Sequence, residues 1–211
     1  MLEAAGDILR LSLGVIFHPI DAFGYIKRNR DFFSYLPIPV MLIAIVAVRV
    51  GTIYIVHFPL STLSPESTSF INEAFRFVLP IVGWAVSCYI MTAIMAGESL
   101  FREVLTASCY AMLPYVLFMI PIALLSRTFS RSEAGIYQLL NVAVWAWVFI
   151  LFFTGVKILN DYTFGKTVFA CAVSIIAMFV IVAVLLLVYA MLNQLGQIIH
   201  DIYTEIRMLN W

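Results

Sequence analysis

Five long apolar runs take up more than half of the 211-residue chain. A helix needs about 20 mostly apolar residues to cross the hydrocarbon core of a bilayer, and each run is that long. The chain is 64% hydrophobic and only 11% charged, which is more apolar surface than a soluble domain of this size can bury. The sequence therefore predicts an all-α fold, a polytopic membrane bundle of five transmembrane helices. The predicted spans are Leu36–Phe58, Ala74–Ala96, Val104–Leu125, Ile136–Val156 and Val168–Leu192.

Two helical segments are expected before the first span. Ala4–Phe17 has a loose amphipathic pattern, and Pro19–Arg28 begins with a proline, which suits the first turn of a helix. We expect both segments to lie at the cytoplasmic interface, with aromatic side chains in lipid and basic side chains among headgroups. Packing against the bundle is the alternative. The predicted interfacial residues are Phe17, Phe23, Lys27 and Arg28.

The C-terminal segment has the clearest amphipathic pattern in the chain. No proline follows Val168, so the fifth span can continue as one helix of about 40 residues, near 60 Å long. Gly196 is the weak point of that helix. An apolar stripe outside the membrane has to be covered by headgroups, by the bundle or by a partner subunit. The predicted partner-binding positions are Leu195, Ile198, Ile199, Ile202, Ile206 and Leu209.

These patterns divide the chain into three parts and orient it. We expect interfacial helices in residues 1–34, the five-span domain in 35–192 and an amphipathic helix outside the membrane in 193–211. Lysine and arginine precede the first span and are absent from the loop that follows it, Pro59–Glu73. This bias predicts a cytoplasmic N-terminus and, after five spans, an outer C-terminus. The loop Ser126–Gly135, with its two arginines, runs against the bias.

Arg49 is the most costly residue for a membrane to hold. A central arginine costs ~2.5–3.5 kcal/mol on insertion scales, so it should face the bundle interior and have a partner. The nearest carboxylates, Glu73 and Glu133, are predicted at the outer ends of spans. We expect the partner to be the Leu117 carbonyl, because Pro121 has no N–H to bond it. A snorkelling arginine with local water is the alternative. Ring faces at similar depth are offered by Trp84, Trp145 and Trp147.

Two prolines in the third span predict a bend. Pro114 and Pro121 are seven residues apart and lie on nearly the same helix face. Kinked helices sometimes mark a solute path in transporters. Neighbouring helices more often repair such kinks, and the chain shows no repeated halves.

No pattern in the chain indicates enzymatic chemistry. There is no phosphate-binding glycine loop, HExxH or GxSxG motif. The net charge of +0 gives no reason to expect nucleic acid as a partner. We therefore expect no catalytic residues, no cofactor and no metal site. The cysteines all lie in predicted spans and the histidines in separate regions: Cys88, Cys109, Cys171, His18, His57 and His200.

Several stretches, taken in order, form a pattern along the chain. The first is a proline-plus-aromatic segment before the membrane, and the second is a glycine loop followed by a tyrosine and proline in the third span. The last is the fourth span with the loop after it. These stretches are His18–Phe23, Gly97–Glu103, Ala107–Tyr115, Trp145–Gly155, Asp161-Tyr162 and Lys166-Thr167. In this order they resemble the bacterial branch of the Yip family.

The resemblance implies five spans, no enzymatic activity and a role through membrane-embedded partners. Bacterial members that resemble this chain tend to be encoded beside carbohydrate ABC importer components. The resemblance therefore implies an accessory or scaffold subunit of such an importer in the bacterial cytoplasmic membrane, with permeases, an extracellular domain and membrane lipids as partners. One alternative is a small-solute transporter or channel with a path near Arg49 and the Pro114/Pro121 kink. Another is a lipid-organising protein that uses its interfacial helices.

Overall fold

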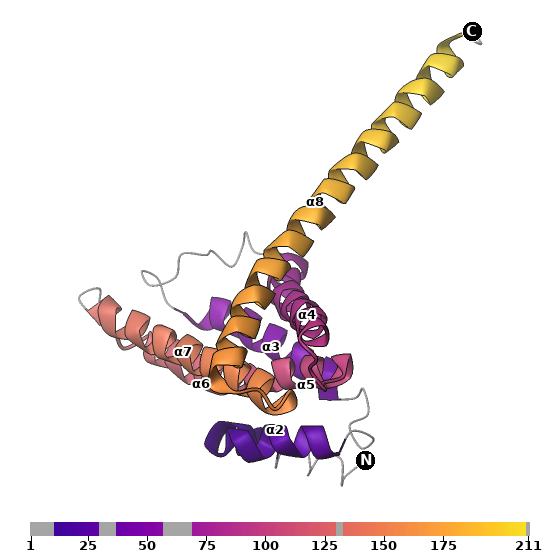
Figure 1. The fold of residues 1–211 in the computed structure, drawn as a ribbon. Helices are drawn as coiled ribbons and strands as arrows, with labels where there is room; N and C mark the ends of the chain where they lie inside the picture. Colours follow the sequence, from indigo (N-terminus) through magenta and orange to yellow (C-terminus); the bar gives the residue numbers. More distant parts are fainter. Residues whose placement is uncertain (1–10, 30–36, 57–68, 130–132, 210–211) are drawn as a thin grey trace.

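The computed structural model describes residues 11–29, 37–56, 69–129 and 133–209, with the backbone alone for 198–209. The described part is helical and contains no strand (Figure 1). Residues 11–17 form a helical stretch, which covers the end of the segment predicted at Ala4–Phe17. The helices that follow are α2 Pro19–Arg28, α3 Pro37–Ile55, α4 Phe70–Ile94, α5 Phe101–Ala111, α6 Leu113–Leu125, α7 Ala134–Leu159 and α8 Phe164–Leu209.

Among the described residues, five segments are long and apolar enough to cross a membrane, which confirms the predicted all-α, five-span architecture. Helices α5 and α6 together form the third span, Phe101–Leu125. The second begins at Ile71, three residues before its predicted start. That small difference brings Glu73 into the span.

The third span is interrupted once, at Met112. The Met112 N–H donates to the Cys109 carbonyl at 3.2 Å. This bond spans three residues, as in a 3₁₀ turn, where an α-helical bond spans four. Two residues later, Pro114 lacks the N–H that would continue the ladder, and it occupies the first turn of α6 instead. Helix α6 then runs through Pro121 without a break. The predicted bend therefore falls at Pro114, which is fully buried, and not at the exposed Pro121.

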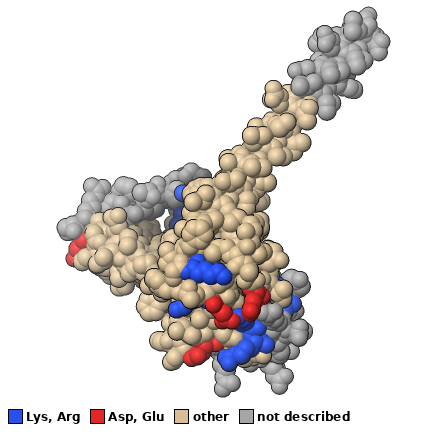
Figure 2. Space-filling model, viewed as in Figure 1, with Lys and Arg blue, Asp and Glu red and all other residues tan. Residues whose placement is uncertain are grey.

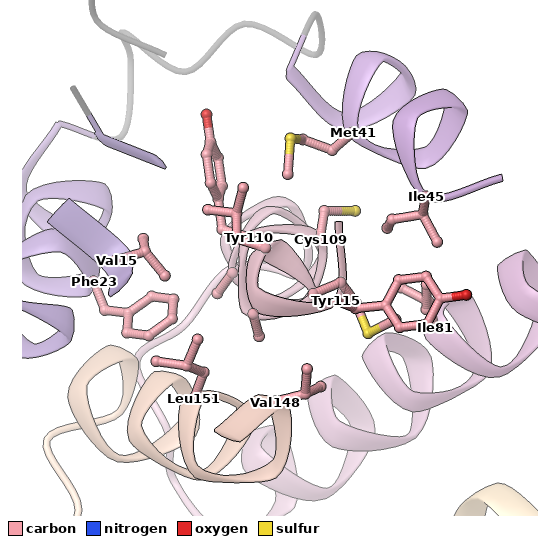
Figure 3. Close-up of a cluster of buried hydrophobic side chains, with 14 of the residues drawn as sticks. Val15, Phe23, Met41, Ile45, Ile81, Cys109, Tyr110, Tyr115, Val148 and Leu151 are labelled. Atoms are coloured by element: carbon pink, nitrogen blue, oxygen red, sulfur yellow. The ribbon is translucent and has the colours of Figure 1, made fainter. Parts of the chain in front are cut away.

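The bundle is built around α5 and α6. In their apolar window, 61% of the residues are buried, against 6% in the window of α8. Figure 3 shows side chains from the surrounding helices converging on this pair, with Tyr110 and Tyr115 both buried in the cluster. Small residues on α5, including Ala107 and Ser108, let its neighbours approach closely.

Helix α8 packs against α4 along its first half only. A Cβ added at Gly83 of α4 would lie 3.8 Å from the Met178 side chain of α8, so the two helices are in contact there. Ser87 of α4 and Ser174 of α8 are both fully buried nearby. Every residue from 183 to 197 is exposed. In Figure 1 the C-terminal half of α8 stands clear of the other helices.

The prediction that the fifth span continues as one long helix is confirmed. Helix α8 has 46 residues without a break, and Gly196 lies within it. With no proline to remove a hydrogen bond, one glycine costs only about 1 kcal/mol relative to alanine and does not end a helix.

Helices α4 and α7 end side by side in the same backbone motif. The N–H of Gly97 donates to the Thr92 carbonyl at 2.7 Å, and the N–H of Tyr162 donates to the Lys157 carbonyl at 3.0 Å. Each bond joins a residue to the one five positions before it, which is the pattern of a Schellman motif at a helix C-terminus. In that motif the residue just before the donor takes a left-handed conformation. Ala96 and Asp161 do so here, with φ of 54° and 50°.

The two ends also bond to each other. The Tyr162 hydroxyl donates to the Thr92 carbonyl at 3.2 Å, and the Ser99 N–H donates to Asn160 Oδ1 at 3.4 Å. Gly97 lies at the contact, where a Cβ would come within 2.3 Å of Asn160 Oδ1 and 2.8 Å of the Thr92 carbonyl oxygen. A side chain at position 97 would therefore force the two helix ends apart.

We expect Gly97→Ala to lower the stability of the folded chain by about 1–3 kcal/mol, the usual cost of forcing atoms into a packed site. The matched control is Gly135→Ala, because a Cβ at Gly135 meets nothing within 4 Å. Thermal unfolding in detergent, followed by a thiol-reactive dye that labels the buried cysteines on unfolding, measures both. Equal midpoints for the two variants would contradict the role given to Gly97.

Candidate functional site

Arg49 is paired inside the bundle with Glu73. Its Nε donates to Glu73 Oε2 at 2.8 Å, and the Glu73 side chain is only 7% exposed. Arg76, one turn further along α4, places Nη1 3.8 Å from the other oxygen of Glu73. Glu73 also lies in the first turn of α4, where the helix dipole favours a negative charge. The pair therefore joins α3 to α4 by a charge-assisted hydrogen bond.

The length of the arginine side chain explains why this pairing is possible. Arg49 lies six residues before the end of α3, about 9 Å below it at 1.5 Å per residue. Glu73 lies three residues into α4, about 4.5 Å below the same end of the bundle. The difference in depth is within reach of the arginine stem.

Aromatic rings cover the pair. The Arg49 guanidinium carbon lies 5.3 Å from the centre of the Phe77 ring, close enough for a cation–π contact. The Phe77 ring centre lies 5.3 Å from that of Tyr115 and 6.5 Å from that of Trp145, and the last two are 5.5 Å apart. We call Arg49, Glu73, Phe77, Tyr115 and Trp145 the arginine cluster. It ties α3, α4, α6 and α7 together at one level.

This geometry corrects two predictions about Arg49. Its hydrogen bond goes to Glu73 and not to the Leu117 carbonyl, because α4 begins early enough to carry a carboxylate to the depth that the arginine can reach. The ring under the guanidinium is that of Phe77. Trp145 joins the same cluster, whereas Trp84 packs edge-on against Phe152, with ring centres 5.5 Å apart.

Lys27 joins α2 to the two helix ends described above. Its Nζ lies 3.3 Å from Glu98 Oε2, and it also bonds to the Asp161 carboxylate. Burial alone would lower the pKa of Lys27, but the hydrogen bonds and charges of Asp161 and Glu98 raise that pKa above its ordinary value of 10.5. The lysine therefore stays charged at neutral pH, and the stabilisation is lost only as the pH rises through the raised pKa. Charged side chains gather at this end of the molecule in Figure 2.

Helix α2 is part of the bundle. Phe23 is fully buried, and its ring atoms lie 3.6 and 3.7 Å from the place of a Cβ on Gly155 of α7. Figure 3 shows Phe23 pointing into the cluster beside Leu151. The prediction that Phe23 dips into lipid is therefore wrong, because the glycine on α7 admits its ring. Phe17 remains 72% exposed, and Arg28 occupies the last turn of α2.

The C-terminal part of α8, residues 183–209, is called the α8 extension, and every residue from 183 to 197 on it is exposed. Leu195, one of the predicted partner-binding residues, is 53% exposed on it. The helical backbone continues to Leu209. The side chains of Ile198, Ile199, Ile202, Ile206 and Leu209 lie outside the described residues.

A cavity between α4, α5 and α7, beside Trp84, Cys88 and Asn160, has a volume of about 10 Å³, which is room for one water. Within the described residues, no three His, Cys, Asp or Glu side chains are placed to hold a metal ion.

Some of these residues were missed at the level of sequence. Glu73 was considered only as a carboxylate at the outer end of a span, although its place near the start of the second span was a usable signal. The bonds of Asn160 and Tyr162 were not predicted; the glycine of Gly97–Glu103 hinted at a close approach between loops.

Comparison with protein families matches the Yip1 domain over residues 13–187. No curated protein and no solved structure matches the chain. The match takes in α2 to α7 and ends inside α8, so most of the α8 extension lies beyond it.

The Arg49–Glu73 pair predicts strong non-additivity. Arg49→Leu and Glu73→Leu should each destabilise the fold by about 3–5 kcal/mol, because each leaves the other charge inside the bundle without the hydrogen bond that joins the pair. The double variant should cost less than the sum of the two, since it leaves no stranded charge. The free energy of unfolding in mixed micelles, measured for the parent, the two single variants and the double variant, gives the coupling between the two residues. Arg76→Leu, at a 67% exposed side chain, is the control and should have little effect. Additive costs would show that the pair is not coupled.

Phe23 and Phe17 make a matched pair for the docking of α2. Phe23→Ala should remove a buried ring worth about 3–5 kcal/mol and free α2 from α7. Phe17→Ala removes an exposed ring and should leave α2 in place. Hydrogen exchange of the amides in Pro19–Arg28 measures the difference. Similar exchange in both variants would mean that the Phe23 contact does not hold α2.

Proposed function

This chain belongs to the Yip1 domain family, and from that premise we propose that it serves as a non-enzymatic scaffold, an accessory subunit of a larger membrane complex. The uncovered length of α8 carries this proposal. Every residue from 183 to 197 is exposed, and the large apolar side chains among them, from Val184 to Leu195, have no cover within the described chain. An apolar surface of this kind commonly marks contact with lipid or with another protein.

The length of α8 favours protein contact for its outer part. Its apolar part, Phe164–Gln197, has 34 residues and is about 51 Å long. A hydrocarbon core of about 30 Å accommodates about 39 Å of helix at a tilt of 40°, the steep end of the usual range. About 12 Å of helix, the length of residues 190–197, then remains beyond the lipid tails, with Met191, Leu192 and Leu195 on it. Another protein can cover it.

The remainder of the bundle suits a rigid base for this helix. The arginine cluster joins α3, α4, α6 and α7, and α4 in turn holds the first half of α8. The joined ends of α4 and α7 and the salt bridges of Lys27 fix the other end of the bundle. A base fixed at both ends can hold the α8 extension at a constant angle for a partner.

The finer proposal is a subunit of a bacterial carbohydrate ABC importer, with the permeases and an extracellular domain as partners. The resemblance of His18–Phe23 and Gly97–Glu103 to bacterial members supports it. The distribution of basic residues supports a cytoplasmic N-terminus and an outer C-terminus, because Lys27, Lys157 and Lys166 lie together at the end where α2 packs. In that orientation the end of α8, from residue 193 to 209, projects outward, toward an extracellular partner.

The contacts of the kink residues weigh against a solute path. Pro114 is fully buried, and Arg49 is held by Glu73 under the Phe77 ring. A lipid-organising role for α2 is likewise weakened by the burial of Phe23. We therefore rank the scaffold first.

Purification of the native protein in mild detergent tests the scaffold. We expect the full chain to bring other membrane subunits in fixed ratio, and deletion of Gln197–Trp211 to remove at least one of them. Phe17→Ala, which changes an exposed residue at the far end of the molecule, is the control and should retain them. Purification without any other subunit would contradict the proposal. Solute flux in liposomes that is lost in Arg49→Ala would favour the transporter.

A further inference from the structure

A seven-residue repeat runs along the α8 extension. Helix α8 continues unbroken to Leu209, so positions that alternate by three and four residues fall on one stripe of the helix. An aliphatic residue occupies every such position for more than three repeats, the signature of a coiled-coil seam. Each seven-residue repeat has two seam positions, three residues apart. The first of the two is occupied by Leu185, Leu192, Ile199 and Ile206, and the second by Val188, Leu195, Ile202 and Leu209.

The seam becomes narrow where the sequence leaves the apolar span. Up to Leu192 the residues between the seam positions are also apolar, as contact with lipid requires. Beyond it they become mostly polar, and Ile198, Tyr203 and Met208 are the apolar exceptions. The polar positions are Asn193, Gln194, Gln197, His200, Asp201, Thr204, Glu205 and Arg207. A two-residue stripe on a polar helix fits a partner helix better than a broad lipid face.

We propose that this seam pairs with the same seam of a second copy of this chain, so that two α8 helices form a parallel coiled coil. The inference rests on the proposed function, in which the α8 extension binds protein. It assigns the seam to a second copy and leaves the rest of the extension to the other subunits. All copies insert with the same orientation, so their α8 helices run parallel. The pairs along the seam are Leu185/Val188, Leu192/Leu195, Ile199/Ile202 and Ile206/Leu209, of which the last is the isoleucine–leucine pair that two-stranded parallel coils favour. A second copy presents the same residues in the same register, so each seam position meets its own counterpart.

The charge of the tail argues against a membrane surface as the cover. Helices that lie flat on anionic bilayers are rich in lysine and arginine. From Asn193 to Leu209 the chain has Asp201 and Glu205 against Arg207 alone, with no lysine. Headgroups therefore do not attract this segment electrostatically.

The described part of the seam is free to pair. Leu185, Val188, Leu192 and Leu195 are 59%, 46%, 63% and 53% exposed, and the contact of α8 with α4 at Met178 precedes all four. Three repeats make a weak coil for two separate peptides in water. Anchoring both helices in one membrane by the same bundle raises their effective concentration and removes much of that cost.

Cysteine cross-linking in native membranes tests the inference. Leu195→Cys lies on the seam, and Gln197→Cys, two residues along, lies on the opposite face at a position that is also exposed. With copper phenanthroline as the oxidant, we expect Leu195→Cys to give a disulfide-linked dimer at a yield at least fivefold above Gln197→Cys. The parent chain, with its cysteines in the bundle, gives the baseline.

The possible results separate this inference from the proposed function. Equal dimer yields at the two positions overturn the seam. An adduct of Leu195→Cys with a different protein overturns the self-pairing but leaves the scaffold standing. If neither position gives an adduct and the chain purifies alone, both fail.

A second pair of variants removes any dependence on the cross-link. Leu195→Glu with Ile202→Glu places charges on the seam, and Gln197→Glu with Thr204→Glu places the same charges opposite it. By light scattering in detergent, the seam variant should have half the protein mass of the control. Equal masses would overturn the coiled coil.

Discussion

A cation buried among apolar helices has to find its partner within the protein, because hydrocarbon offers no water to solvate it. In this chain the partner of Arg49 is Glu73, and the 2.8 Å bond between them sets the depth and rotation of α4 relative to α3. Rings from α4, α6 and α7 then close over the pair. Since α4 also carries the face on which α8 packs, the placement of α8 follows from that bond.

At the opposite end of the bundle, backbone carbonyls also have to find hydrogen-bond partners within the protein. Two helices that end side by side expose carbonyls that no helix bond satisfies. Schellman turns at Ala96 and Asp161 satisfy some of them, and the Tyr162 hydroxyl shares its single proton between the carbonyls of Thr92, at 3.2 Å, and Met95, at 3.4 Å. These turns place Glu98 and Asp161 beside Lys27. The docking of α2 is thus linked to the satisfaction of the helix ends.

The features that sequence predicted are those that depend on neighbouring residues in the chain. Hydropathy over 20 residues located five spans, and the lack of proline after Val168 predicted the length of α8. The partner of Arg49 depends on where α4 starts, and a start predicted at Ala74 left Glu73 outside the span. The pattern of α2 identified an apolar face but not the surface on which that face packs. Phe23 meets Gly155, which lies 132 positions away, and periodicity within α2 carries no information about that residue.

Helix α8 is packed against another helix along its first half and exposed along its second half. Its first half is held by α4 through small and buried residues such as Gly83, Ser87 and Ser174, where close approach replaces the hydrophobic effect. From residue 183 to 197 every residue is exposed. Lipid can cover the part at membrane depth, but the sequence becomes polar at Asn193 and Gln194. The aliphatic stripe continues past that boundary in the same register. A stripe that keeps its register from lipid into water is suited to a partner that crosses the same boundary, and a second membrane-anchored helix does so.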